Sequence, residues 1–289
     1  MSFDAREDFL SHRPPQWPAR SDRAPESEVA ATHCFLLDAD DDLAELFDLR
    51  MRLAARQVVT AAVFESPVGP CELGPWFAHV GSGFGLLVLD GVMAIDACVG
   101  DRTATELVGT GDLVQPRAEL PDEILEHGDG YRTLRAARIA LLDAAFAERA
   151  RPWPQITSEL LRRAGRRATD LDVLRAITSQ PRLEVRLTLV LWHFARRWGR
   201  VEPSGIHLCL PLTHRLLGQI IGAERPSVSH ALARLARAGL VTGNADDLHL
   251  HGSVEDHLWQ LLERSEPVVP AARRASLRAR RLERSDAAS

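Results

Sequence analysis

Four side chains with hydrogen-bonding groups follow one another closely in the second half of the chain: Arg225, Ser227, Ser229 and His230. An arginine guanidinium is a planar set of donors that matches the O6 and N7 acceptors on the edge of a guanine. Hydroxyl and imidazole groups also bond to base edges or to phosphates. The cluster offers the hydrogen-bonding chemistry of nucleic-acid recognition.

The segment Pro211–Val241 predicts two helices that would position these side chains. Thr213 suits the N-cap of a first helix, and Gly222 stands where a tight corner needs positive φ. A second helix is expected to begin near Arg225, with Pro226 in its first turn, where the missing N–H costs nothing. The inward apolar positions are Leu216, Leu217, Ile220, Val228, Leu232 and Leu235. This pattern indicates a helix-turn-helix, which presents the first residues of its second helix to the DNA major groove; an ordinary helical hairpin is the alternative.

The residues after the second helix predict a small wing. Gly239 is expected to cap the helix, and Leu240-Val241 and Leu248–Leu250 to form two strands on either side of Asp246-Asp247.

The distribution of charge agrees with a nucleic-acid-binding second half. The 289 residues carry a net charge of −5 and suffice for two domains. Residues 1–150 hold 13 Arg against 26 Asp and Glu, a net −13, whereas residues 151–289 hold 22 Arg against 14 acidic residues, a net +8. A basic half beside an acidic one indicates a polyanion-binding module joined to a different domain.

The sequence pattern of the first half is typical of an antiparallel β-domain. Val58–Phe64 is a short β-rich run, and Asp90-Gly91 between two apolar runs predicts a hairpin. Further turns are expected at Gly100-Asp101 and Gly109–Asp112. Short strands at regular spacing indicate a small barrel or jelly roll.

A long amphipathic helix is expected between the two halves. Ile156, Leu160, Leu171 and Leu174 recur at helical spacing. A stripe of this length must be buried, so we expect these four residues to pair with their copies in a second subunit.

With these features in place, the sequence resembles the cyclic-AMP receptor (Crp/Fnr) family of bacterial transcription regulators over about residues 33–252. The resemblance rests on GFGLLVLDGVMAIDACVG, RTATELVGTGDLVQP, RLEVRLTLVLWHFARRWGRV and, most specifically, LTHRLLGQIIGAERPSVSHALARL. It implies an α+β chain with an N-terminal β-roll (jelly roll) of the cyclic-nucleotide-binding type, a long dimerisation helix and a C-terminal winged helix-turn-helix. It also implies a homodimer that reads an inverted repeat in double-stranded DNA and contacts RNA polymerase.

The resemblance assigns roles to individual residues. Arg225, Ser229 and His230 fall on base-contacting positions, although His230 stands where arginine is usual. Thr213 and His214 fall on phosphate-contacting positions, and Ser227 is assigned to phosphate as well. Pro226 replaces a glutamate that commonly reads cytosine, so the family's usual half-site is not expected.

The ligand pocket departs from the family pattern. Gly111-Asp112-Leu113 is followed by Val114–Arg117, without the Gly-Glu and Arg-Ser/Thr-Ala of a phosphate cassette. Arg132-Thr133 is the nearest match, but Leu134 follows it. Because a buried phosphate would lack partners, cyclic AMP binding is not expected, and the effector is unknown.

These observations give a domain plan. We expect a disordered tail over 1–31, a sensor-like β-roll over 32–150, the dimerisation helix over 151–180 and the winged helix-turn-helix over 181–252. A C-terminal helix and an arginine-rich tail (Arg273–Arg284) are expected over 253–289.

Other chemistry finds little support in the sequence. His249 and His251 alternate onto one strand face, and His207 lies seven residues from His214, but no third ligand stands nearby, so no metal site is expected. There is no GxSxG, HExxH or P-loop, so no enzyme is expected. Without a signal peptide or an apolar span, the protein is expected to be cytoplasmic. Two alternatives stay open: a jelly-roll enzyme or small-molecule binder, and a sequence-tolerant architectural DNA-binding protein.

Overall fold

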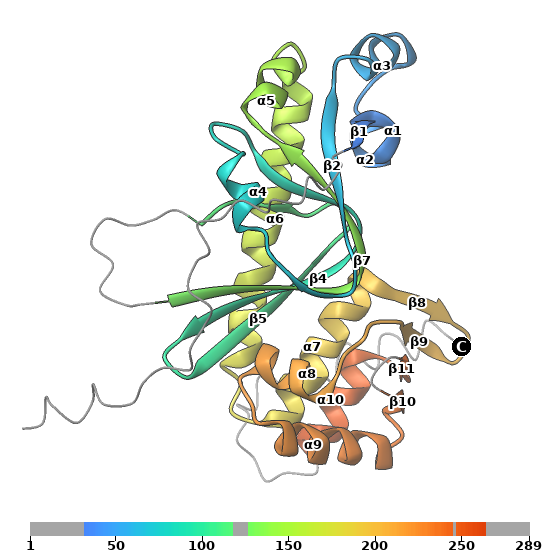
Figure 1. Ribbon diagram of the computed structural model, residues 1–289. Coiled ribbons are helices and arrows are strands. Elements are labelled where there is room, and N and C mark those ends of the chain that lie inside the picture. Colours follow the sequence, from blue (N-terminus) through green and yellow to red (C-terminus); the bar gives the residue numbers. More distant parts are fainter. Residues whose placement is uncertain (1–31, 118–126, 245–246, 264–289) are drawn as a thin grey trace, which may run out of the picture. The chain divides into compact units, whose positions relative to one another are not determined.

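The computed structural model describes residues 32–117, 127–244 and 247–263. The predicted tail over 1–31 and the arginine-rich segment Arg273–Arg284 lie outside these residues. The chain divides into two compact units, Met1–Leu171 and Asp172–Ser289 (Figure 1). Among the helices of the described part, none has the length and apolar content that a membrane crossing requires.

The first unit is an antiparallel β-roll, as the sequence predicts. Its main sheet has the order β1-β2-β7-β4-β5, with β3 paired to β7 and β6 paired to β4. The strands are β1 (Thr32–Phe35), β2 (Thr60–Ser66), β3 (Gly69–Cys71), β4 (Gly85–Val99), β5 (Arg102–Gly109), β6 (Leu113–Val114) and β7 (His127–Leu142). The short helices are α1 (Leu36–Ala39), α2 (Asp41–Ala44), α3 (Leu49–Arg56), α4 (Gly74–Ala78) and α5 (Ala144–Ala150).

The hairpin predicted at Asp90-Gly91 is wrong. β4 runs unbroken through these two residues, and its register with β7 shifts on either side of them. Gly91 has a φ of 95°, and a Cβ there would lie 2.4 Å from the carbonyl oxygen of Ala136. The Asp-Gly pair therefore forms a β-bulge, where glycine permits the close approach of β7. The turns predicted at Gly100-Asp101 and Gly109–Asp112 do connect strands.

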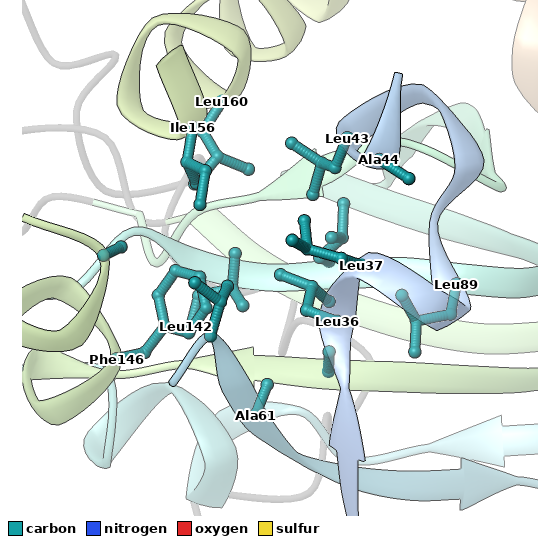
Figure 2. Close-up of a cluster of buried hydrophobic side chains, with 14 of the residues drawn as sticks. Leu36, Leu37, Leu43, Ala44, Ala61, Leu89, Leu142, Phe146, Ile156 and Leu160 are labelled. Carbon is teal, nitrogen blue, oxygen red and sulfur yellow. The ribbon is translucent and has the colours of Figure 1, made fainter. Parts of the chain in front are cut away.

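The long helix α6 (Pro154–Thr178) covers the range that the sequence predicts. Two of its apolar residues, however, do not face outward: Ile156 and Leu160 are completely buried in the first unit's own core, beside Leu142 and Phe146 (Figure 2). Their assignment to a dimer interface is therefore corrected. These two residues of the predicted stripe hold α6 to the β-roll, and truncating either of them to Ala would cost about 2–5 kcal/mol.

Charged side chains join α6 to the roll as well. Arg163 has no exposed surface and donates to both carboxylate oxygens of Asp40, at 2.5 and 2.8 Å, and to Glu159 at 2.8 Å. Burial alone lowers the pKa of Arg163, but its hydrogen bonds to Asp40 and Glu159 more than offset this and raise the pKa above its ordinary value. Asp40 also caps α2 by accepting from the Leu43 amide. Asp40 thus serves both helix capping and an internal ion pair.

The second unit contains α7 (Leu183–Trp198), α8 (His214–Ile221), α9 (Arg225–Arg237) and α10 (Val254–Glu263). Its sheet has the order β10-β11-β9-β8, where β10 is Val241–Asn244, β11 is Asp247–Leu250, β9 is Gly205–Leu208 and β8 is Gly199–Glu202. The sequence predicts the wing hairpin β10–β11. It gives no sign of β8 and β9, which are too short to show a clear alternation of apolar residues.

Candidate nucleic-acid interface

The corner between α8 and α9 forms as the sequence predicts. The hydroxyl of Thr213 accepts from the Leu216 amide at 3.2 Å, which caps the first turn of α8. Gly222 ends α8 in the left-handed region, with φ 65° and ψ 48°. Pro226 occupies the first turn of α9, where no intrahelical N–H is needed. These three positions together fix the crossing of the two helices.

Two residues that the sequence analysis did not single out secure this corner. Arg186, on α7, donates to the carbonyl oxygens of Ile221 at 2.9 Å and of Gly222 at 3.4 Å, and so satisfies groups at the end of α8. Gly218 lies under the turn, and a Cβ on it would come within 2.4 Å of the carbonyl oxygen of Ala223. The chain can therefore fold back closely only because Gly218 has no side chain.

The two faces of α9 differ in burial and in polarity. Val228, Ala231 and Leu235 are buried against the rest of the second unit. Arg225 and His230, at the N-terminal end, are exposed. Exposed donors at this end of the second helix are what a helix-turn-helix uses to reach base edges.

His214 and Ser229 lie together and join the two helices. The Ser229 hydroxyl donates to the carbonyl oxygen of Arg225 at 3.0 Å and lies 2.7 Å from Nδ1 of His214. Since a hydroxyl has a single proton, the His214 Nδ1–H must be the donor in the second bond. One lone pair of Ser229 is left, so in this arrangement the hydroxyl can accept one further hydrogen bond but has no second proton to donate.

Two further predicted contact residues, Ser227 and Thr213, are exposed, and Thr213 keeps its own hydroxyl proton while it accepts from the Leu216 amide. Two other arginines of α9 have partners within the second unit. Arg234 forms an ion pair with Glu184, a nearly buried residue of α7. This ion pair holds α9 against α7. Arg237 donates to the carbonyl oxygen of Ala233 within its own helix.

In the first unit, the arginine nearest to a phosphate-binding pattern already has partners. Arg132 on β7 donates twice to Asp96 on β4, at 3.0 and 3.1 Å, and Thr105 donates to the same carboxylate. Gly111 and Asp112 form the turn into β6, while residues 118–126, where the rest of a cassette would fall, lie outside the described residues.

The comparisons with known proteins agree with this architecture. Residues 185–251 match the model of the Crp-like helix-turn-helix domain. FixK2 from Bradyrhizobium japonicum is 15% identical, with 73% of this chain and 99% of that chain covered and a TM-score of 0.51. The c-di-GMP-responsive global regulator CLP of Xanthomonas campestris is 17% identical, with 74% and 100% covered and a TM-score of 0.51. A CooA variant from Carboxydothermus hydrogenoformans is 16% identical, with 68% and 86% covered and a TM-score of 0.51. A search of curated protein sequences gives no match.

At these identities the solved structures establish the fold, and the domain match identifies the second unit. The chain carries a Crp-like helix-turn-helix domain and has the fold of the Crp/Fnr transcription regulators.

Proposed function

We propose that this protein is a homodimeric transcription regulator that reads an inverted repeat in double-stranded DNA through α9. The observation that carries the proposal is the separation of faces on α9, with Val228 and Leu235 buried and the donors Arg225 and His230 exposed at its N-terminal end. The net +8 of residues 151–289 adds attraction for phosphates. Contact with RNA polymerase is part of the same proposal.

Within this proposal the side chains have separate tasks. Arg225 reads a guanine through its two parallel donors, and His230 reaches a neighbouring base. Ser229 accepts from a base while it holds His214 in place. Thr213, His214 and Ser227 contact phosphates, which fix the register of the protein on the duplex without selecting its sequence.

A second seam on α6 supports the homodimer. Leu161 and Leu171 are 63% and 42% exposed, and with the exposed Ala168 they fall on the seven-then-three spacing of a coiled-coil seam. The small Ala168 side chain between the leucines permits close approach of a second α6. Within the proposal, Leu171 lies in the dimer interface, while Leu174 is half-buried.

Within the same proposal, the β-roll does not bind cyclic nucleotides. Arg132 is bonded to Asp96, and Val114–Arg117 supplies no cassette for a cyclic phosphate. Calorimetry is therefore expected to show no saturable heat with cyclic AMP or cyclic GMP. Micromolar binding of either nucleotide would contradict the degenerate pocket but leave DNA binding by α9 untouched.

The decisive experiment selects bound sequences from a random DNA pool and then compares Arg225→Ala with Arg237→Ala at fixed salt. The two variants remove the same side chain from opposite ends of α9, so their net charges are equal. Arg225→Ala is expected to cost about 1–3 kcal/mol on the selected site and to relax one symmetric base-pair position. Arg237→Ala is expected to weaken selected and scrambled DNA by the same small factor.

Two outcomes would contradict the proposal. If selection enriches no inverted repeat, the protein binds DNA architecturally or not at all. If Arg225→Ala weakens selected and scrambled DNA equally, Arg225 contacts phosphate and reads no base.

A further inference from the structure

Two histidines far apart in the sequence are neighbours on one face of the second unit's sheet. His207 on β9 and His249 on β11 are direct register partners, and their rings stack in parallel with centroids 4.4 Å apart. Asp247 lies two residues before His249, so its side chain points to the same face. Glu202 reaches both rings from β8.

The nitrogens of the two histidines lie close to carboxylate oxygens on both sides of the rings. One ligand atom from each of His207, Asp247 and His249 lies within 4.8 Å of the others. Asp247 Oδ1 contacts Nε2 of His207 and lies 3.5 Å from Nε2 of His249. On the other side of the rings, the Glu202 carboxylate lies 3.6 Å from Nδ1 of His207 and 3.9 Å from Nδ1 of His249.

The orientation of the two rings suits a shared metal ion. Both Nε2 atoms face Asp247 Oδ1 and both Nδ1 atoms face the Glu202 carboxylate. A neutral imidazole has one lone pair and one N–H, so each Nε2 can coordinate the ion while each Nδ1–H points to Glu202. Metal-bound histidines usually donate their second nitrogen to a carboxylate in this way.

We propose that His207, His249 and Asp247 bind one divalent transition-metal ion of the zinc class, with Glu202 orienting both imidazoles. Two imidazoles and one carboxylate suit Zn²⁺, Ni²⁺ or Co²⁺, whereas Mg²⁺ and Ca²⁺ prefer oxygen ligands. Three protein ligands leave one tetrahedral position for water or a further ligand. Arg200, the register partner of His207 on β8, adds a positive charge on this face, which the two carboxylates outweigh.

The burial of these side chains suits an ion that enters from solvent. The side chains of His207 and His249 are 21% and 28% exposed, and that of Asp247 is 52% exposed. The ion would link β9 to β11 and thereby hold the wing hairpin β10–β11 to the rest of the sheet. Binding to the native state raises its stability in proportion to the logarithm of metal concentration.

The test titrates ZnCl2 into the chelator-treated full-length protein and follows heat and the thermal transition. We expect one saturable Zn²⁺ per chain, a raised transition temperature, and no saturable response to MgCl2. His207→Gln and His249→Gln should abolish this binding. Glu202→Gln keeps all three ligands and should lower the affinity for Zn²⁺ by about 10–100-fold. Circular dichroism shows whether each variant is folded.

His251→Gln is the matched control. His251 is a histidine of the same sheet region, but its nitrogens bond to Thr242 and to the carbonyl oxygen of Ser204, so its loss should leave Zn²⁺ affinity unchanged. Absence of saturable Zn²⁺ binding in the wild type would overturn the proposal. So would equal affinity in the folded double variant His207→Gln, His249→Gln. Neither readout involves DNA, so failure here is separate from failure of the proposed function.

Discussion

At the scale of single residues, two glycines allow α9 to follow α8 through a tight corner. Gly218 lies where the chain turns from α8 to α9, and its missing Cβ leaves room for the carbonyl oxygen of Ala223. Gly222 provides the left-handed backbone at the same corner. The sequence shows the second requirement clearly, because glycine at a helix end is a known signal. The sequence does not show the requirement at Gly218, because a glycine inside a helix indicates only a lower helix propensity.

Replacing Gly218 by Ala is therefore expected to destabilise the second unit. The added Cβ would lie 2.4 Å from a backbone oxygen, so the turn must shift, at a cost of about 1–3 kcal/mol. Gly165→Ala on α6 is the matched control: nothing lies within 4 Å of its Cβ position, and better helix propensity should stabilise by roughly 0.5–1 kcal/mol. Chemical denaturation measures both. Equal effects of the two substitutions would show that Gly218 is not a packing requirement.

His257 provides a pH dependence at the same scale. It is almost fully buried; its Nδ1 accepts from the Trp192 indole N–H at 3.2 Å, so its proton lies on Nε2, which donates to the carbonyl oxygen of His251 at 2.6 Å. Burial lowers the pKa of His257, against the opposing effect of the His251 carbonyl.

Because the pKa of His257 is lower in the folded state, the unfolded chain binds the second proton, which makes the ring cationic, more readily. The free energy of unfolding therefore falls as the pH drops below the ordinary histidine pKa. Denaturation at about pH 7.5 and about pH 5.5 is expected to show this loss. In His257→Phe the pH dependence should shrink while the stability at neutral pH also falls. An unchanged slope in this variant would assign the effect to another group.

At the scale of elements, the structure separates two roles that the sequence merges on α6. Ile156 and Leu160 show a clear helical period, but a period states only that a face is buried and not which partner buries it. The first unit's own core covers that face. Leu161, one residue further along, is exposed and starts the other seam.

The double variant Leu161→Asp, Leu171→Asp is accordingly expected to shift the protein to monomer. Two charges placed on the seam of Leu161, Ala168 and Leu171 would face their copies in the partner. Val173→Asp is the control, since Val173 is similarly exposed, at 39%, but lies off the seam on the same helix. Sedimentation velocity measures the oligomeric state. A double variant that stays dimeric would place the dimer interface elsewhere.

The limits of sequence interpretation also lie at this scale. Pairing of His207 with His249 depends on the register of β9 and β11, and nothing local in the sequence fixes the pairing of two strands so far apart. The nearby pairs that the spacing suggests do not form: His214 bonds to Ser229 and His251 to Thr242. Likewise Asp90-Gly91 satisfies the local rule for a hairpin, but β4 pairs with β7 on both sides of it, so the pair forms a bulge. Local signals such as Thr213 and Gly222, by contrast, are predicted correctly.

At the scale of the whole molecule, the proposed dimer restricts the DNA more than either unit does alone. Two copies of α9 related by a two-fold axis read two half-sites, which must face the same side of the duplex. That condition requires half-site centres separated by about one helical turn, near 34 Å, or a multiple of it. The acidic first half, at −13, discourages non-specific wrapping of DNA around the β-roll.

Changing the spacing of the selected site tests this condition directly. Inserting about five base pairs between the half-sites turns one of them to the opposite side of the helix, so the dimer should retain only one half-site and bind like the Leu161→Asp, Leu171→Asp monomer. Inserting about ten base pairs restores the facing, and any recovered affinity measures how far the two copies of α9 can separate. Gel-shift titration at fixed salt compares the three sites. If all three bind the wild type equally, each protomer binds independently, and the inverted repeat has no role in recognition.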